Sequence, residues 1–463
     1  MHIFDSVKRK KVEFISQVPN KAVIYLCGPT VYDDAHLGHA KSAVAFDLLR
    51  RTLIADGYDV TFIRNITDID DKIIQKASDS GISIADVAEK YIASYHRDLD
   101  ALGVMRPDIE PRATESIESM IELIEKLLEK NHAYAISNGD IYFDTSSDKK
   151  YLSISHRKSD EHISRIESVS EKRNSGDFVL WKIDEKIGFK SPFGHGRPGW
   201  HLECSAMIEK HTPLKNRAYS IDIHAGGADL LFPHHENEAA QTRCATDKEI
   251  ASYWMHNGFV TIDDEKMSKS LGNSFFLKDL LEKFHGEVIR YYLLSVHYRA
   301  DFNFSSDDLI SSKRRLDKIY RLKKRLFGIK ANSHSDDFKN ALLDALRDDL
   351  NSSKAYAITD EFINSANEEL DKNSKDKKFN QNIVANIELL ESILGVGGLN
   401  PYDYFQFGID DDKKAHIEAL IKERAEAKKS RDFTKADSIR DELTELNISI
   451  MDTPDGTLWE SRD

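Results

Sequence analysis

The sequence predicts an α/β protein, in which a doubly wound parallel sheet carries an insertion and is followed by a helical bundle and a small α+β end. Three observations support this prediction. Apolar stretches of strand length alternate with helical patterns up to about residue 275. A polar segment at 145–177 interrupts this alternation. Beyond residue 275, helical periodicity dominates until a short turn-rich segment ends the chain.

The first elements are a strand, a helix and a second strand. Residues 22–27 form a short apolar run that stops at Gly28, and from Ala40 apolar residues recur at helical spacing until Gly57. The β-branched stretch 58–66 then completes a βαβ unit. Because ligands of parallel sheets bind at the carboxyl ends of the strands, the residues that follow the first strand are expected to lie in a site.

The next stretch, about 100–215, is interpreted as an insertion. A helix is expected at 83–102 before it, another at 114–130 inside it, and a hairpin with Asn138-Gly139 at its turn covers 133–144. The following polar segment, 145–177, is expected to be partly mobile because it has few large apolar residues.

Alternation of strands and helices then resumes. Residues 178–183 and 219–224 are expected to be strands, and 259–262 a last short strand. A helix that carries Cys204 lies between the first two, and another helix is expected to begin at Pro233.

Helical periodicity is typical of the C-terminal half. It covers four stretches, which are 277–296, 307–327, 338–365 and 382–394. A linker with several glycines and Pro401 follows. These features predict a helical bundle before the terminal unit.

Composition excludes several classes of protein. Hydrophobic residues make up 40% of the 463 residues, enough for two or three domains with real cores. The net charge of -14 argues against indiscriminate nucleic-acid binding but allows local basic patches. The N-terminus MHIFDSVKRKK has no apolar signal core, so we expect a cytoplasmic protein without membrane contact. Three scattered cysteines do not form a disulfide framework.

Two short motifs lie on either side of the α/β stretch, His36-Leu37-Gly38-His39 and Lys266-Met267-Ser268-Lys269-Ser270. Alone, the first reads as two surface histidines at a helix start and the second as a solvated basic loop. Together and in this order they indicate phosphate chemistry, because a helix N-terminus favours anions and cationic side chains can stabilise charge on phosphate oxygens.

Four further residues form a plausible metal set. Cys27 ends a strand, Cys204 lies on a helix, and His234 and Glu238 are four residues apart and hence on one helix face. Spacing alone leaves two alternatives open. The cysteines could be small buried hydrophobes, and His234-His235 could suggest a metalloprotease, although the pattern is His-His-Glu-Asn-Glu rather than His-Glu-x-x-His.

A double-glycine turn follows the strand at 219–224. It reads His224-Ala225-Gly226-Gly227-Ala228-Asp229, so its backbone could approach a nucleotide while Asp229 faces ribose hydroxyls. The alternative is an ordinary turn that ends the strand and binds no ligand.

The segments CGPTVYDDAHLGHA, GWHLECSAM, FPHHENE and DDEKMSKSLGN resemble the cysteinyl-tRNA synthetases among the class I aminoacyl-tRNA synthetases, and the likeness covers nearly the whole chain. The resemblance implies a Rossmann-like catalytic domain at 1–275, a helical stem/contact region at 276–330, a bundle at 331–400 and an anticodon-binding end at 401–463. It implies the following residue roles: catalytic His36, His39, Lys266 and Lys269; ATP-binding Gly28, Gly38, His224, Gly226, Asp229 and Lys269; an amino-acid pocket with Thr67 and Trp200; and zinc ligands Cys27, Cys204, His234 and Glu238.

The same resemblance implies the activity and the partners. A monomer would hold one Zn²⁺, use ATP with Mg²⁺ to convert L-cysteine to cysteinyl-adenylate, and transfer the cysteinyl group to tRNA(Cys). Zinc would select the substrate thiolate, because a hydroxyl is a poorer ligand. Two alternatives remain, a ligase that joins cysteine to an amino sugar and a catalytically silent RNA-binding paralogue.

The terminal unit carries basic residues interleaved with acids. Arg424, Lys428, Lys429, Arg431, Lys435 and Arg440 could meet phosphates, and Trp459 could stack on an unpaired base. The alternative is a salt-bridged solvent face with a buried tryptophan. The resemblance favours RNA contact for the unit as a whole.

Overall fold

The computed structural model describes residues 1–157, 171–212, 217–262, 265–266, 276–453 and 456–461. Four parallel strands form its central sheet in the order β10-β9-β3-β4, with bounds Glu249–Asn257, Tyr219–Gly227, Lys21–Leu26 and Asp59–Arg64. From β3 the chain proceeds to β4 on one side, and from β9 to β10 on the other. The crevice outside the carboxyl ends of β3 and β9 is therefore the topological switch point, where such sheets bind ligands.

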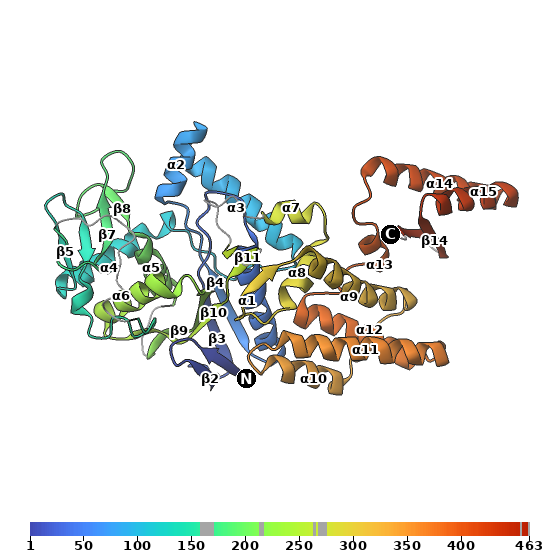
Figure 1. The fold of residues 1–463 in the computed structure, drawn as a ribbon, viewed down its shortest axis with the longest axis horizontal. Coiled ribbons are helices and arrows are strands. Elements are labelled where there is room, and N and C mark those ends of the chain that lie inside the picture. Colours follow the sequence, from blue (N-terminus) through green and yellow to red (C-terminus); the bar gives the residue numbers. More distant parts are fainter. Residues whose placement is uncertain (158–170, 213–216, 263–264, 267–275, 454–455, 462–463) are drawn as a thin grey trace.

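Helices cover both faces of this sheet, which confirms the doubly wound prediction (Figure 1). Along β3, Ile24 and Leu26 pack in the core that contains α1 (Leu37–Ala55). Tyr25 points the other way, into a core shared with α5 (Trp200–His211) and α6 (Glu236–Thr246). The two faces alternate because strand side chains have a period of two.

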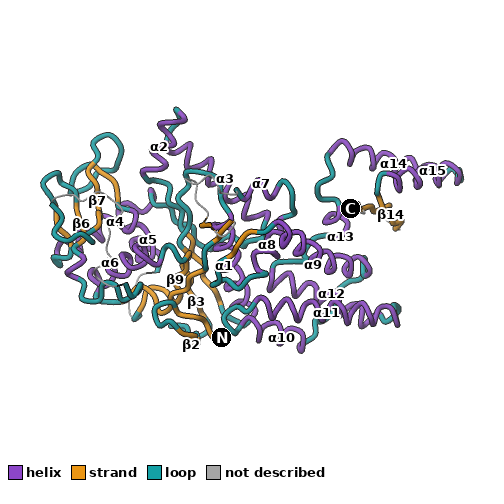
Figure 2. Tube along the Cα trace, viewed as in Figure 1, coloured by secondary structure: helices purple, strands orange, loops and turns teal. Residues whose placement is uncertain are grey.

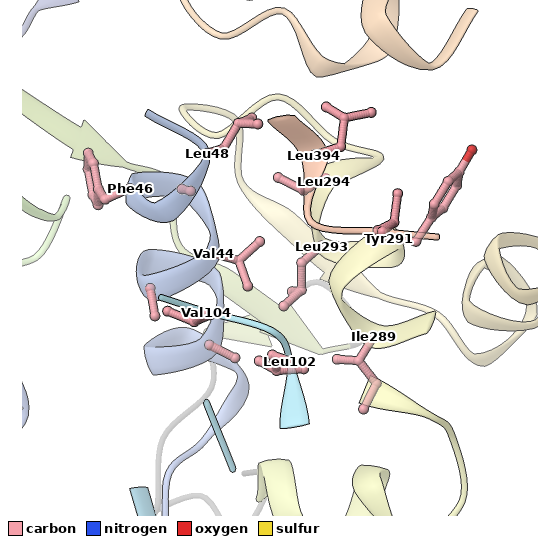
Figure 3. Close-up of a cluster of buried hydrophobic side chains, with 14 of the residues drawn as sticks. Val44, Phe46, Leu48, Leu102, Val104, Ile289, Tyr291, Leu293, Leu294 and Leu394 are labelled. Carbon is pink, nitrogen blue, oxygen red and sulfur yellow. The ribbon is translucent and has the colours of Figure 1, made fainter. Parts of the chain in front are cut away.

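One core joins the sheet domain to the C-terminal helices. Figure 3 shows Val44 and Leu48 of α1 near Leu102, Leu293 and Leu394, which come from distant parts of the chain. All of these side chains are buried, and each contributes roughly 2 kcal/mol of hydrophobic stabilisation.

The insertion forms a separate antiparallel sheet with the order β5-β6-β7-β8, with bounds Ala133–Ala135, Ile141–Phe143, Phe178–Ile183 and Gly196–Pro198. The expected hairpin, with Gly139 at its turn, is present. The helix α4 (Ile117–Glu129), preceded by the single turn Thr114–Ser116, covers this sheet.

The polar segment 145–177 is less loose than expected where the structure describes it. After the short turn Thr145–Ser147, the buried Glu236 accepts hydrogen bonds from the backbone of residues 152, 154 and 155, and Asp177 accepts from the backbone and hydroxyl of Thr145. Buried carboxylates thus hold this segment, together with the buried side chain of Ile154. Residues 158–170 lie outside the described part.

Several elements are additional to those predicted. They include β1 (His2–Asp5) with β2 (Lys10–Glu13), α2 (Asp71–Ser80), β10, and β13 (Phe302–Phe304), which pairs with β11 (Val260–Ile262). The predicted helix at 83–102 is α3 (Ile84–Ala101). The helix predicted from Pro233 begins later, as α6, because the turn Leu231–His235 precedes it and Phe232 has extended backbone angles.

The C-terminal half is helical, as predicted (Figure 2). The helices are α7 (Leu277–Leu281), α8 (Gly286–Leu294), α9 (Ser306–Arg325), α10 (Asp336–Leu346), α11 (Ser352–Lys372), α12 (Lys377–Leu394) and α13 (Pro401–Phe405). The stretches 277–296 and 338–365 are each two helices rather than one. The second break contains the buried Asp349, which accepts from the backbone of Phe4 and from Tyr298.

The terminal unit lies beside the helical bundle (Figure 1) and has its own small core. It consists of α14 (Asp411–Lys429), α15 (Phe433–Glu445) and the hairpin β14 (Ile448–Thr453) and β15 (Gly456–Ser461), which confirms the α+β expectation. Within the described ranges, no helix has the length and apolar character needed to cross a membrane.

Candidate functional site

Glycines allow the close packing at the switch point. A Cβ on Gly28 would lie 1.7 Å from the carbonyl oxygen of Asn65, so the ends of β3 and β4 can meet only at glycine. A Cβ on Gly226 would lie 2.8 Å from a ring carbon of His235. Both positions therefore require glycine for packing, whatever ligand binds there.

The four predicted metal ligands are brought together, although they come from β3's end, α5 and the segment around α6. The Sγ atoms of Cys27 and Cys204 are 3.8 Å apart. His234 Nε2 lies 3.6 Å from Cys204 Sγ and 3.0 Å from Glu238 Oε1, which is 3.7 Å from Cys27 Sγ. Three of the four side chains are buried.

These separations suit one tetrahedral Zn²⁺ ion. Zn–S bonds of about 2.3 Å and Zn–N bonds of about 2.0 Å place two sulfur donors about 3.8 Å apart and a sulfur and a nitrogen about 3.5 Å apart. The observed 3.8 Å and 3.6 Å agree with this geometry. Two soft sulfurs, an imidazole and a carboxylate also form a donor set that zinc prefers.

A second donor set overlaps the first and was missed from the sequence. It consists of Cys27, His224, His235 and Glu238. His235 Nε2 lies 3.3 Å from Cys27 Sγ, and His224 Nε2 lies 2.8 Å from Glu238 Oε2. The imidazole of His224, which we expected at the nucleotide, thus lies among the candidate metal ligands. The signal in the sequence that could have revealed this set is the His234-His235 pair, of which the prediction includes only His234 as a ligand.

Burial keeps these imidazoles neutral, and neutral imidazoles have the lone pair that a metal needs. Burial lowers the pKa of His234 to about 3 and that of His235 well below its usual value. Burial, with Cys204 next to it, raises the pKa of the Cys27 thiol well above its ordinary range. A thiolate at Cys27 therefore needs a nearby positive charge, which a divalent cation supplies.

Two further histidines contact the Nδ1 atoms of His234 and His235, on the side of each ring away from the cysteines. His201 Nδ1 lies 3.0 Å from His234 Nδ1, and His256 Nε2 lies 2.8 Å from His235 Nδ1. His256 in turn contacts the hydroxyl of Ser6 in the N-terminal hairpin. Such outer contacts fix which nitrogen of a histidine faces a metal.

A pocket of about 430 Å³ opens beside this cluster, between the sheet domain and the insertion. Trp200 lines it, is 40% exposed and stacks on His234 with ring centroids 4.2 Å apart. Thr67 is buried, and its hydroxyl donates to Glu203 at 2.7 Å. Trp200 thus forms a wall of the pocket, whereas Thr67 supports Glu203, another of its lining residues.

His36 and His39, the two histidines of the first motif, lie side by side at the first turn of α1. Their rings stack with centroids 3.8 Å apart, and each Nδ1 accepts a backbone N–H, His36 from Gly38 and His39 from His36. In a neutral imidazole the proton then lies on Nε2 as a donor. Gly38 is required here because its Cβ would lie 2.9 Å from the ring of His36.

The lysine motif is described only in part. The backbone of Lys266 lies in β12 (Glu265–Lys266), which pairs with β11, whereas Lys269 lies outside the described residues. The chain is described again from Phe276, which pairs with His36, and the N–H of Leu277 donates to the carbonyl of Ala35 at 2.8 Å.

Asp229 is exposed just beyond the end of β9. In the terminal unit, Trp459 is buried, so the structure does not support base stacking on it. Four of the basic side chains there pair with acids, namely Arg424 and Lys428 with Asp452, Lys435 with Glu423, and Arg440 with Asp437.

Known proteins resemble this chain in two ways. A family model described as the tRNA synthetases class I (C) catalytic domain matches residues 13–314, and one described as the cysteinyl-tRNA ligase anticodon binding domain matches residues 410–459. The cysteine–tRNA ligase of Sulfurimonas denitrificans is 58% identical over 99% of this chain and 100% of its own length. That of Helicobacter pylori is 56% identical over 99% of both chains.

Solved structures agree on the fold. Methionyl-tRNA synthetase of Mycobacterium tuberculosis in complex with methionyl-adenylate superposes with a TM-score of 0.60 at 15% identity, over 81% of this chain and 92% of that chain. The ternary complex of Agrobacterium radiobacter LeuRS gives a TM-score of 0.58 at 12% identity, over 83% and 85%.

Proposed function

The chain belongs to the cysteine–tRNA ligases, a family of class I aminoacyl-tRNA synthetases, and we propose that Cys27, Cys204, His234 and Glu238 hold one Zn²⁺ ion that selects its substrate. The observation that supports this most directly is the meeting of four soft and borderline donors at the switch point of the sheet, at tetrahedral separations.

A cysteine–tRNA ligase uses ATP in two steps. The carboxylate of cysteine attacks the α-phosphate of ATP, which gives cysteinyl-adenylate and releases pyrophosphate. The terminal adenosine of the tRNA then takes the cysteinyl group and AMP leaves. Neither step needs a nucleophile from the protein, so its residues must position the reactants and stabilise charge on phosphate oxygens.

We assign the phosphate side of the site to the start of α1. The N-terminus of the helix favours negative charge, and His36 and His39, with their Nδ1 atoms occupied by backbone N–H groups, present Nε2 as donors. Lys266 and Lys269 would reach the same phosphates. The pairing of Phe276 with His36 supports this assignment, because it returns the chain to the start of α1 soon after the motif.

The adenosine side would lie along the ends of β3 and β9. Gly28, Gly38 and Gly226 let a nucleotide approach the backbone, and the exposed Asp229 would accept from ribose hydroxyls. His224 would contribute through its backbone, since its imidazole faces Glu238.

Selection of cysteine would take place at the metal cluster. When bound, zinc would supply a soft Lewis acid that the thiolate of cysteine can ligate and the hydroxyl of serine cannot. Trp200 would close the pocket over the substrate, and Thr67 would hold Glu203 in place. A site built around one group of the correct substrate can reject an analogue that lacks it by ~10⁴ or more without an editing domain.

The remaining assignments follow from the family. We propose the division into 1–275 with its insertion at about 100–215, 276–330, 331–400 and 401–463, with tRNA(Cys) contacting the last unit through exchangeable ion pairs. The enzyme would act in the cytoplasm as a monomer, with Mg²⁺ accompanying ATP. Full-length similarity to cysteine–tRNA ligases, including the terminal domain, weighs against the amino-sugar ligase and the silent paralogue.

The zinc assignment is tested with two matched cysteine variants. Cys204→Ser removes a proposed ligand, whereas Cys244→Ser changes another buried cysteine on α6 that belongs to neither donor set among the described residues. Zinc content measured by mass spectrometry should fall in Cys204→Ser, and cysteine-dependent pyrophosphate exchange should fall by more than the ~100-fold loss of activity that outer-shell changes can cause. Both should stay near wild type in Cys244→Ser. Normal zinc and normal exchange in Cys204→Ser would overturn the assignment.

A further inference from the structure

The helix α8 carries two buried charged residues one turn apart, Glu287 and Arg290, and each binds a different part of the chain. Arg290 is fully buried, donates to Asp47 of α1 at 2.6 Å and to the carbonyl of Leu394 at 2.7 Å. The same α1 begins with the signature histidines. Arg290 therefore ties α8 to the helix that carries the catalytic motif.

Glu287, the other residue, holds the connection between the bundle and the terminal unit. One of its carboxylate oxygens accepts from the hydroxyl of Tyr320 at 2.5 Å and from the N–H of Gly397 at 3.0 Å. The hydroxyl of Tyr320 also accepts from the N–H of Leu399 at 3.3 Å. Two backbone groups of the connecting segment are thus bound by buried side chains.

Such binding matters because this connection is rich in glycine. Gly395 and Gly397 have φ values of 71° and 86°, which glycine adopts without strain, and Gly398 follows. A glycine-rich stretch left to solvent behaves as a flexible linker. Here its path is held by Glu287 and Tyr320, and by Lys323, whose Nζ donates to the carbonyls of Gly397 at 2.7 Å and Gly398 at 3.2 Å.

The ring of Tyr320 extends the contact to α13. It stacks on Tyr404 with centroids 3.8 Å apart and an interplanar angle of 12°. The hydroxyl of Tyr404 donates to the buried Asp317 of α9 at 2.8 Å. Both rings are buried.

From α13 the contacts reach the terminal unit. Helix α13 packs on β15, and the side chain of Gln406 donates to the carbonyl of Trp459, a core residue of that unit, at 2.8 Å. In Figure 1, α13 lies between the helical bundle and the terminal unit. A continuous set of buried contacts therefore runs from α1 through α8 and α9 to the unit that belongs to the anticodon-binding family.

We propose that Glu287, Tyr320 and Tyr404 are positioning residues for aminoacylation, which hold the glycine linker and so set the place of the terminal unit relative to the active site. A tRNA must contact both sites at once. Fixing one site relative to the other raises the effective concentration of the second contact, which a flexible linker would lower. The activation of cysteine, which needs no tRNA, does not depend on this joint.

The test uses Tyr404→Phe and Glu287→Gln, with Tyr356→Phe as the matched control. Tyr356 is also buried, stacks on Tyr291 of α8 with ring centroids 4.1 Å apart and donates its hydroxyl to the backbone carbonyl of Tyr291, so it contacts the same helix without bonding to the linker. The joint variants should raise KM for tRNA about tenfold, the effect of one buried hydrogen bond, and leave pyrophosphate exchange within twofold. The control should change neither.

Two results would overturn the proposal. One is an unchanged KM for tRNA in both joint variants, and the other is a proportional loss of exchange and aminoacylation, which indicates a general structural role. A measurement on the wild-type enzyme covers the case in which a variant does not fold. The amide protons of Gly397 and Leu399 should exchange with deuterium as slowly as those of α9. Exchange as fast as in an exposed loop would contradict a fixed linker.

Discussion

The cluster of candidate metal ligands and the terminal unit use charged side chains in opposite ways. In the cluster, Cys204, His234 and Glu238 are almost fully buried, and each donor atom faces the others. In the terminal unit, Lys435 and Arg440 are more than half exposed and pair with acids on the surface. Buried groups keep their geometry and exclude water, whereas exposed ion pairs can exchange a carboxylate for a phosphate at little cost.

This difference fits the two recognition tasks that we propose for the two regions. Discrimination between cysteine and serine depends on one atom and needs a preorganised, dry site. Contact with a large polyanion needs many weak interactions that salt can screen. The contacts around Glu287 and Tyr320 connect the two regions. Because activation of cysteine needs no tRNA, a change in the cluster should affect activation, whereas a change in the terminal unit should affect only transfer to tRNA.

The largest effect is expected at the start of α1. His36→Ala removes a proposed phosphate donor and should lower pyrophosphate exchange by ~10²–10³-fold, the loss typical of one transition-state donor. Zinc content should be unchanged, because the metal ligands lie on other elements. Exchange within tenfold of the wild-type rate would contradict the role of His36, and a loss of zinc would show that the two parts of the site are coupled.

The next largest effect is expected from removal of the terminal unit, which should impair aminoacylation but not pyrophosphate exchange. Truncation after Gly408 should leave pyrophosphate exchange within twofold, since the cluster and α1 are intact. Aminoacylation of tRNA should fall by ~100-fold or more, because a second binding site is lost. Undiminished aminoacylation would remove the terminal unit from tRNA recognition.

The smallest effect concerns the stability of the terminal unit. Hydrogen bonds from Arg424, followed by those from Lys428, hold the pKa of Asp452 below its usual value of about 3.9. The ion pairs therefore stabilise the unit above that pH, and this stability is lost as the pH falls through the lower, folded-state pKa. Because Asp452 is half exposed, Asp452→Asn should cost less than about 1 kcal/mol at pH 7.

Thermal unfolding of the wild type and of Asp452→Asn at several pH values checks this sign. The difference in midpoint should begin to shrink below pH ~4, where the carboxylate of the unfolded chain takes up a proton, and should vanish only below the lowered pKa of the folded state. Asp437→Asn is the control, since its pair with Arg440 is exposed and 3.6 Å long. A difference that grows as the pH falls would contradict the assignment of Asp452.

The sequence predicted the sheet and the meeting of Cys27, Cys204, His234 and Glu238 better than it predicted the residues around these four side chains. The spacing of His234 and Glu238 placed both on one face, and the structure has them 3.0 Å apart. His235 was missed because the helix rule puts neighbours on different faces, whereas the turn Leu231–His235 is irregular and brings both histidines to Cys27 and Cys204.

Other differences arise from tertiary contacts that local patterns do not encode. The strand β10 was missed, although it completes the sheet beside β9. Asp349 interrupts a stretch of helical periodicity because it binds the backbone of Phe4 across the fold. For Trp459 the sequence left stacking on a base and burial both open, and the structure places it in the core, since a unit this small has few other large apolar side chains to bury.

The most direct test of the central claim is pyrophosphate exchange with cysteine and with serine on enzyme whose zinc content is measured in the same preparation. We predict exchange with cysteine only, at about one zinc per chain, loss of exchange after chelation and recovery when zinc is restored. Exchange with cysteine that persists in zinc-free, folded enzyme, or equal exchange with serine, would contradict selection of the substrate by a metal held at Cys27, Cys204, His234 and Glu238.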